Sequence, residues 1–183
     1  MPRKLHSDKS YKINKGVFGM IDKPHTACFS GHRDIPQEDI TVVRERTEAV
    51  IESLIQKGVI YYGCGGAYGY DLLAAETVLE LKVKYPHIFL IIVKPCREQI
   101  AKWKNKADID RYNSVLERAD KIKCLSEEHY SGCELERNKY LVKFSGYCIC
   151  YLTKQSGGTA FTVRLAKENG LILYNVSADR QQE

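Results

Sequence analysis

The segment YYGCGGAYGYD, residues 61–71, joins a run of β-branched and aromatic residues to a helix-like stretch that begins at Leu72. A strand, a glycine-rich turn and a helix N-terminus in this order form an anion site, because free backbone N–H groups and the positive end of the helix dipole converge there. The glycines do not follow the spacing of the dinucleotide-binding motif cleanly, so the segment also fits a tight turn whose glycines serve backbone geometry alone. The segment predicts a strand–turn–helix unit and leaves both interpretations of its glycines open.

Short apolar runs alternate with helix-like segments along the rest of the chain. The run Ile88–Val93 is apolar throughout, which is typical of a central parallel strand buried on both faces. We therefore predict an α/β, Rossmann-like fold, an open and mostly parallel sheet of about six strands with helices on both faces. The expected strands are residues 26–30, 59–62, 88–93, 121–125, 147–152 and 171–174; the expected helices are 38–56, 71–84, 97–118 with a break near Lys106, 134–144 and 160–168.

The two ends of the chain differ from its centre. Residues 1–23 are polar and basic without sustained periodicity, so we expect a mobile or loosely docked N-terminal extension. Residues 24–177 are expected to form a single Rossmann-like domain, because a chain of this length suits one hydrophobic core. Residues 178–183 are expected to form a C-terminal tail.

No apolar run approaches the roughly 20 residues that span a bilayer, and the basic N-terminus lacks the apolar region of a secretory signal. We therefore expect a cytoplasmic protein without a membrane partner. The net charge of +5 suits a phosphate-bearing ligand and does not demand nucleic acid. The cations beside Trp103, between Lys94 and Lys106, are interpreted as a solvated helix face rather than as a nucleic-acid patch, so nucleic acid is not the expected partner.

The seven cysteines also favour a cytoplasmic location. Most of them lie within or just after expected strands, where a free thiol behaves as a small apolar side chain. The sequence has no C-x-x-C pair and no Cys/His set with zinc spacing, so we expect no metal site, no cofactor and no disulfide framework. The cysteines assigned to strands are Cys28, Cys64, Cys96, Cys124, Cys148 and Cys150.

Three polar, glycine-bearing turns follow expected strands, namely Ser30–Arg33, Gly63–Asp71 and Thr153–Thr159. In a doubly wound sheet, ligands bind outside the carboxyl ends of the strands at a topological switch point. If the three strands are near neighbours, their turns face one pocket, and this convergence favours ligand binding more than any single turn does. With two residues of a later helix, the expected ligand-binding residues are Ser30, Gly31, His32, Arg33, Gly65, Gly66, Ala67, Gly69, Asp71, Arg137, Asn138, Gly157, Gly158 and Thr159.

The side chains of these turns suggest separate roles. Arg33 suits a phosphate in fork geometry, and His32 donates either to a phosphate or to a neighbouring carbonyl. Asp71 suits a ribose hydroxyl, because a phosphate would repel it, or it caps the following helix without any ligand. Ser156 is a second N-cap candidate, and the two glycines after it permit a ligand to approach the backbone closely.

A polar group formed by Glu134, Glu136, Arg137 and Asn138 opens the helix before the fifth strand. Glu134 and Asn138 share one face of that helix, at positions i and i+4. A carboxylate here acts as an acid or base, binds ribose, or forms a surface salt bridge. Glu76, one turn into the second helix, has the same divided interpretation, so the catalytic candidates are Glu134 and Glu76.

Four ordered segments resemble the YpsA-like branch of the SLOG superfamily, also known as the DUF1273 family. They are CFSGHRD at residues 28–34, GGAYGYDLLAAE at 65–76, GCELERN at 132–138 and TKQSGGT at 153–159. The superfamily is named for the Smf/DprA DNA-processing proteins and the LOG cytokinin-activating enzymes. The resemblance implies a Rossmann-like fold, a pocket for nucleotides or nucleotide-derived molecules, and assembly into homo-oligomers.

The chain departs from the LOG-type nucleotide phosphoribohydrolases at their signature P-G-G-x-G-T-x-x-E. The corresponding residues, SGGTAFTV at 156–163, keep the glycines and the threonine but offer no carboxylate at position 162 or 163. This motif therefore does not support the hydrolytic chemistry of those relatives. Glu134 or Glu76 would have to supply the carboxylate from another strand end.

Three hypotheses for the function follow, and whether the chain is an enzyme stays open among them. The first is a cytoplasmic protein that senses or sequesters a nucleotide-derived ligand such as ADP-ribose, an NAD derivative or a mononucleotide. The second is an N-glycoside hydrolase acting on a nucleoside monophosphate, in which a carboxylate stabilises an oxocarbenium-like centre. The third is DprA-like binding of single-stranded DNA, which needs a basic groove with stacking aromatics. The tyrosines on expected strands are assigned to the core instead: Tyr61, Tyr62, Tyr147 and Tyr151.

Overall fold

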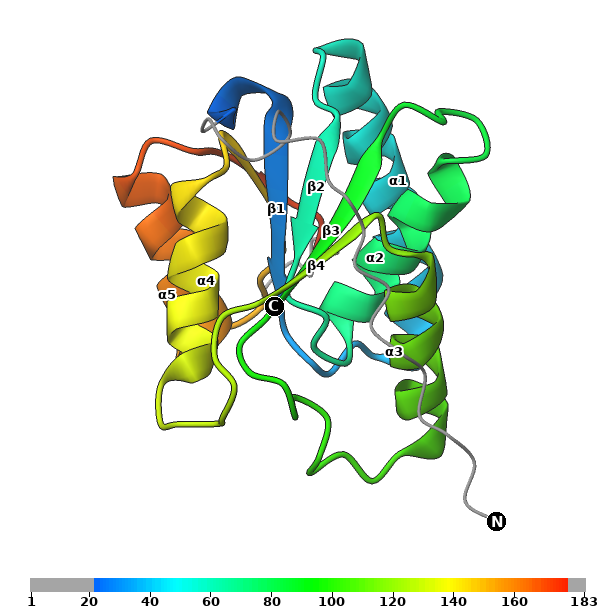
Figure 1. The fold of residues 1–183 in the computed structure, drawn as a ribbon. Coiled ribbons are helices and arrows are strands. Elements are labelled where there is room, and N and C mark those ends of the chain that lie inside the picture. Colours follow the sequence, from blue (N-terminus) through cyan, green and yellow to red (C-terminus); the bar gives the residue numbers. More distant parts are fainter. Residues whose placement is uncertain (1–21, 178–183) are drawn as a thin grey trace.

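Six parallel strands form the sheet at the centre of the computed structural model, which describes residues 22–177 (Figure 1). The strands lie in the order β4-β3-β2-β1-β5-β6, and each pairs in parallel with its neighbours. The predicted α/β, Rossmann-like architecture is confirmed. The strands are β1 (Thr26–Gly31), β2 (Tyr61–Cys64), β3 (Phe89–Lys94), β4 (Lys121–Cys124), β5 (Tyr147–Tyr151) and β6 (Ile172–Asn175).

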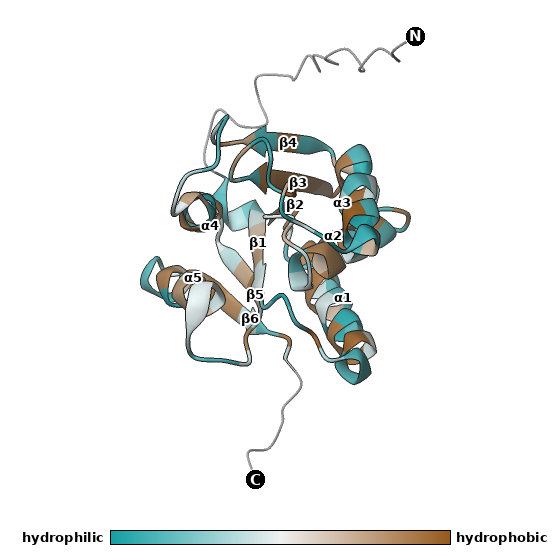
Figure 2. Cartoon of the chain, turned by 90° about the horizontal axis from the view of Figure 1, so that it is seen from below, coloured by the Kyte–Doolittle hydropathy of each residue, from teal (hydrophilic) through white to brown (hydrophobic). Residues whose placement is uncertain are grey.

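Helices cover both faces of the sheet (Figure 2). The first three helices pack on one face, and the last two pack together on the other. The α-helices are α1 (Ile40–Gln56), α2 (Tyr70–Leu81), α3 (Lys106–Arg118), α4 (Cys133–Lys143) and α5 (Gly157–Glu168), and two short 3-10 helices are η1 (Lys23–His25) and η2 (Gln37–Asp39). Among residues 22–177, none of the helices combines the length and the apolar character needed to cross a membrane.

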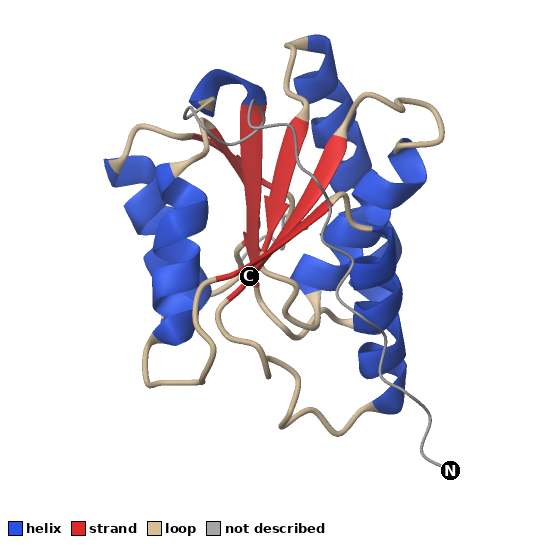
Figure 3. Cartoon of the chain, in the orientation of Figure 1, coloured by secondary structure: helices blue, strands red, loops and turns tan. Residues whose placement is uncertain are grey.

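The strand order places a topological switch point between β1 and β5. The chain first builds β1 to β4 outward in one direction, and then returns to pair β5 with the other side of β1. The loops that leave the carboxyl ends of the strands gather at the lower edge of the sheet in Figure 3, drawn in tan. In open α/β sheets, ligands bind at this edge next to the switch point, because a crevice forms where neighbouring connections diverge to opposite faces.

The core follows from the apolar pattern. β3 is apolar along most of its length in Figure 2, and Leu90 and Ile92 are fully buried on one face while Ile91 and Val93 are buried on the other. Burial on both faces is what a continuous apolar strand predicts. The strand tyrosines divide, because Tyr62 and Tyr151 are buried, whereas Tyr61 and Tyr147 are only partly buried.

Two of the boundaries that differ from the sequence prediction have a local cause. The helix expected from residue 97 begins only at Lys106, because the side chain of Asn105 accepts hydrogen bonds from the N–H groups of Ala107 and Asp108 and caps it there. Residues 97–105 form turns and irregular structure, so the solvated helix face expected for the cations beside Trp103 was wrong. β2 begins two residues later than expected, since the N–H of Val59 still bonds to the end of α1.

Most of the cysteines are buried, as expected for thiols on or after strands. Cys124 departs from the expectation because it lies exposed on the edge strand β4. Cys133, which the strand pattern did not include, is buried at the start of α4. Of the expected N-terminal extension, residues 1–21 lie outside the described residues, and so does the whole of the expected C-terminal tail.

Candidate functional site

A cavity of about 350 Å³ lies at the switch point, below the carboxyl ends of β1 and β5. We call it the polar cavity. Its walls come from the end of β1 and the turn after it, the start of α2, the first turns of α4 and α5, and the turn after β5. The site candidates that line it are Ser30, Gly31, His32, Arg33, Ala67, Asp71, Glu134, Arg137, Asn138, Gly158 and Thr159.

The remaining candidates lie outside this lining, and the reason is visible at two glycines. A Cβ atom on Gly65 would lie 2.1 Å from Nη1 of Arg137, and one on Gly69 would lie 2.1 Å from the carbonyl oxygen of Arg33. The space freed by these missing side chains is therefore filled by protein, not left for a ligand. Gly158 at the start of α5 differs, because a Cβ there meets no atom within 4 Å. The candidates outside the lining are Gly65, Gly66, Gly69, Gly157 and Glu76.

Arg137 lines the polar cavity and links its walls through hydrogen bonds. Its side chain is buried, and Nη1 donates to the carbonyl oxygen of Gly65 at 2.6 Å. Its Nε donates to the side-chain oxygen of Asn138 at 2.7 Å, and the amide nitrogen of Asn138 donates to Oγ1 of Thr162 at 2.9 Å. These bonds join α4 to the β2–α2 turn and to α5, so they fix the relative positions of three cavity walls.

Asp71 lies in the first turn of α2, and the N-cap position is held by Gly69, so the capping role considered for Asp71 was wrong. Its carboxylate is buried and accepts a hydrogen bond from the N–H of Ala67 at 3.3 Å. Burial raises the pKa of this carboxyl group, and the charge of Arg137 opposes the rise. A buried carboxylate at a cavity wall is suited to bind hydroxyl groups, which donate to it without adding charge.

His32 connects the turns after β1 and β5. Its Nε2 accepts a hydrogen bond from the N–H of Lys154 at 3.2 Å, and its ring lies edge-on to Tyr151. Because Nε2 accepts from a backbone donor, the donor role expected for His32 stays a prediction for its other ring nitrogen, Nδ1. Burial, and then the charge of Lys154, lower the pKa of His32 below its ordinary value of 6.5.

Acidification is expected to destabilise the protein through His32. Because the folded state lowers this pKa, the unfolded chain takes up the proton first, so the contribution of neutral His32 is intact above pH 6.5 and is lost as the pH falls through the folded value. Urea unfolding between about pH 8 and 5 measures the effect, which is expected to shrink in His32→Gln. His87→Gln, an exposed control, should retain the native pH slope. Equal slopes for the native protein and His32→Gln would contradict the assignment.

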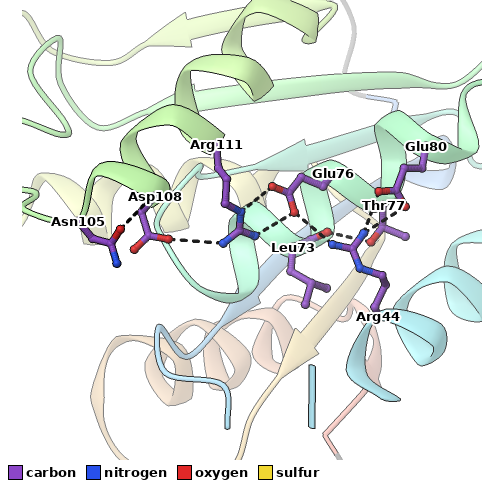
Figure 4. A network of polar contacts seen from close by, with 8 residues as sticks. All are labelled: Arg44, Leu73, Glu76, Thr77, Glu80, Asn105, Asp108 and Arg111. Atoms are coloured by element: carbon purple, nitrogen blue, oxygen red, sulfur yellow. Dashed lines mark hydrogen bonds and ion pairs between the residues drawn. The ribbon is translucent and has the colours of Figure 1, made fainter. Parts of the chain in front are cut away.

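Glu76 lies in an ion-pair network that joins α1, α2 and α3 (Figure 4). Arg111 donates to both of its carboxylate oxygens, at 2.7 and 2.9 Å, and Arg44 approaches one of them at 3.3 Å. Arg44 also pairs with Glu80 at 3.0 Å. The network holds Glu76 on the face of the sheet that α1, α2 and α3 cover, in a cavity other than the polar cavity. Its chemistry is that of a structural cross-link between helices.

A second cavity, of about 590 Å³, adjoins the polar cavity and shares Arg33 and Glu134 with it. We call it the aromatic cavity because Tyr68 and Trp103 line it, their rings edge to face with centroids 5.2 Å apart. The guanidinium of Arg33 stacks over Tyr68 at 4.9 Å from the ring centroid. Tyr68 and Trp103 are candidate site residues that were not predicted from the sequence. The available signal was an aromatic side chain in each of two polar, turn-rich segments.

Glu134 opens α4 at the border of the two cavities, and its side chain is about half exposed. Burial acts to raise its pKa, but hydrogen bonds from the helix start and Cys133, together with His129, outweigh it and lower the pKa. His129 Nε2 lies 3.4 Å from one carboxylate oxygen, and the thiol of Cys133 donates to the other at 3.4 Å. Glu134 is therefore an ionised carboxylate that faces both cavities.

The family model YpsA, described as the YspA SLOG family, matches residues 31–172. A UPF0398 protein of Halalkalibacterium halodurans is 33% identical over 132 residues, which cover 70% of this chain and 69% of that protein. A UPF0398 protein of Brevibacillus brevis is 27% identical over 159 residues, covering 79% of this chain and 84% of that protein. The matched region contains nearly every residue that lines the polar cavity.

Two solved structures share the fold. DNA processing protein A from Helicobacter pylori, whose structure is described for its single-stranded DNA binding mode, aligns with a TM-score of 0.63 and 20% identity over 89% of this chain and 70% of that one. DNA processing protein A from Streptococcus pneumoniae aligns with a TM-score of 0.62 and 15% identity, over 88% of this chain but only 53% of that one. Likeness at this identity establishes the fold. The expectation that nucleic acid is not a partner finds no support in these neighbours.

Proposed function

The chain belongs to the YpsA family of the SLOG superfamily, and from that premise we propose that it binds a nucleotide-derived small molecule at the carboxyl edge of its sheet. One observation carries the proposal. Turns that follow β1, β2 and β5, far apart in the sequence, converge with the first turns of α4 and α5 on the polar cavity. Helix N-termini in such a place attract anions, because their free N–H groups and dipoles point at the ligand.

The polar cavity suits the phosphate and ribose of such a ligand. The open backbone at Gly158 and the hydroxyl of Thr159 offer hydrogen bonds at the start of α5, and Arg33 and Lys154 supply positive charge. The buried carboxylate of Asp71 suits the ribose hydroxyls. Because cations and a carboxylate line one small space, the cavity favours a ligand that carries both phosphate and hydroxyl groups over a simple anion.

The aromatic cavity suits the base. Tyr68 and Trp103 present ring surfaces on which a planar base stacks, and Arg33 stands at the border between the base and phosphate subsites. Two adjoining cavities, one polar and one aromatic, match the two ends of a mononucleotide, of ADP-ribose or of an NAD derivative. The proposed role of the protein is to sense or sequester that molecule.

Thermal unfolding with candidate ligands tests the proposal. A ligand at 100 times its Kd adds about 2.7 kcal/mol of stability, so ADP-ribose, NAD, AMP or a cyclic nucleotide is expected to raise the melting temperature of the native protein. Arg33→Ala is expected to lose most of that shift, whereas Arg164→Ala on the exposed face of α5 keeps it. The proposal fails if no nucleotide raises the melting temperature and Arg33→Ala behaves like the native protein.

Fluorescence separates the two subsites, because Trp103 is the single tryptophan of the chain. A ligand with a base is expected to change its emission, while ribose 5-phosphate is expected to stabilise the protein without that change. If both ligands change the emission equally, the aromatic cavity is not the base subsite.

Hydrolysis of an N-glycosidic bond is the second candidate, and the position of Glu134 favours it. This ionised carboxylate lies at the border of the two cavities. A nucleotide with its base in the aromatic cavity and its ribose in the polar cavity would place its N-glycosidic bond at this border. Release of free base from AMP, lost in Glu134→Gln while the thermal shift by AMP persists, would establish an enzyme. Intact AMP after prolonged incubation with a protein that it stabilises would leave the binding function alone.

Single-stranded DNA binding is the third candidate, and the cations Lys102 and Lys104 beside Trp103 favour it. A stretch of this kind combines positive charge with a stacking surface. Retention of single-stranded DNA that weakens steeply with salt, and that a nucleotide displaces, would place the strand in the aromatic cavity. Retention that no nucleotide displaces would place it on another surface.

A further inference from the structure

Three side chains that offer metal ligands meet where the loop after β4 enters α4. His129, Cys133 and Glu134 each present one ligand atom, and these atoms all lie within 4.8 Å of one another. The carboxylate is central, because one of its oxygens lies 3.4 Å from His129 Nε2 and the other 3.4 Å from the Cys133 sulfur. The cluster is a nitrogen, sulfur and oxygen set built from six consecutive positions of the chain.

The local backbone brings the three together. The N–H of Cys133 donates to the carbonyl oxygen of Tyr130 at 3.1 Å, which folds the loop back over the start of α4. Gly132 takes φ of 92° at the N-cap position, a conformation that permits this turn. His129 therefore stands beside the first helical residues, Cys133 and Glu134.

The donor set is that of zinc. Zn²⁺ takes thiolate, imidazole and carboxylate ligands at about 2.0–2.3 Å in tetrahedral geometry, so neighbouring ligand atoms lie about 3.3–3.8 Å apart. Each oxygen of the Glu134 carboxylate lies 3.4 Å from one of the other two ligand atoms, which is within this range, and rotation of the half-exposed His129 side chain brings the three donors onto one metal position. Ca²⁺ and Mg²⁺ prefer oxygen ligands, which disfavours them at a site with a thiol. Zinc deprotonates the thiol that coordinates it, so binding of the metal releases the proton of Cys133.

We propose that His129, Cys133 and Glu134 bind Zn²⁺, with the fourth coordination position open to the aromatic cavity. Two observations give the site this direction. Of the three side chains, Cys133 is buried, whereas His129 and Glu134 line the aromatic cavity. Three protein ligands with one open position let zinc hold an exchangeable ligand, whereas a purely structural zinc site has four protein ligands. The site does not depend on nucleotide binding.

Cobalt substitution of the full-length protein is the direct test. Co²⁺ is expected to produce a sulfur-to-cobalt charge-transfer band and the visible bands of a tetrahedral site, and Zn²⁺ is expected to remove both by displacement. Cys133→Ser should lose the charge-transfer band, whereas Cys124→Ser, which removes the exposed thiol of β4, should keep it. A cobalt spectrum without a thiolate band, or a band that persists in Cys133→Ser, overturns the proposal.

Zinc affinity provides a second measurement, by competition with a chromophoric chelator. His129→Ala is expected to weaken binding at least tenfold, and His87→Ala, a control on the loop between α2 and β3, is expected to leave it unchanged. His129 is half exposed in a loop, so its replacement is expected to leave the fold intact even if the buried Cys133 does not tolerate serine. Native affinity in His129→Ala overturns the proposal. Because neither experiment contains a nucleotide, both are independent of the proposed function.

Discussion

Gly69→Ala is expected to lower the free energy of unfolding by about 3–5 kcal/mol. Gly69 has φ of 84° and ψ of −128°, which L side chains avoid. Its Cβ would also lie 2.1 Å from the carbonyl oxygen of Arg33 and 2.5 Å from the Arg33 Cα. The backbone before Arg33 is fixed, because the N–H of His32 donates to the carbonyl oxygen of Tyr151 and the carbonyl oxygen of His32 accepts from the N–H of Tyr70. Moving it away from a new Cβ would break these hydrogen bonds.

A second glycine separates the two sources of this cost. Gly157 has a similar φ of 86°, but a Cβ there meets no atom within 4 Å. Gly157→Ala is therefore expected to cost only the conformational part, about 1–2 kcal/mol. Urea unfolding of both variants measures the difference, which is the cost of the contact between the two turns. If Gly69→Ala costs no more than Gly157→Ala, the turn that carries Arg33 does not rest on the start of α2.

The fold could be predicted from the sequence because its signals are local. Apolar runs such as residues 88–93, proline and glycine punctuation, and helical periodicity each act within a few residues, and a parallel sheet with right-handed crossovers leaves few arrangements for them. The boundary errors arose where one short-range capping bond decides the matter. Asn105 begins α3 with such a bond at the break expected near Lys106, and residues 97–105 before it form no helix.

The site could be predicted only in outline. That turns after β1, β2 and β5 converge follows from the rule for parallel sheets, which needs no side-chain detail. Which glycine faces a ligand depends on distant residues, since Arg137 is 72 positions from Gly65 in the sequence and yet fills the space beside it. The sequence pattern is the same for a glycine that admits a ligand and for one that admits an arginine.

The aromatic cavity and the metal-ligand cluster were missed for a related reason. Trp103 lies in irregular structure, where no periodicity assigns a side chain to a face. The cluster at Cys133 combines a loop histidine with two residues of a helix start, and its spacing matches none of the familiar zinc motifs. Such sites arise from loop conformation, which a single sequence specifies weakly.

Arg137→Ala is expected to lower the free energy of unfolding by about 3 kcal/mol, because it removes a buried cation that compensates a buried carboxylate. The variant loses the hydrogen bonds from Arg137 to Gly65 and Asn138, and Asp71 remains buried without the charge that stabilises it. Arg164→Ala, an exposed control on α5, is expected to change stability by less than about 0.5 kcal/mol. Urea unfolding at neutral pH measures both.

The pH dependence of this loss identifies its cause. Burial already raises the pKa of Asp71, and removal of Arg137 is expected to raise it further, because the guanidinium charge is the largest effect that opposes burial. A folded-state pKa above the unfolded value means that the folded protein holds the proton more tightly. The stability therefore rises as the pH falls through the folded-state pKa, and it levels off below the unfolded-state pKa. The deficit of Arg137→Ala is therefore expected to be largest at neutral pH and to shrink on acidification, and Asp71→Asn in the same background should remove that dependence. A deficit that stays constant with pH would mean that Arg137 acts through packing and hydrogen bonds alone.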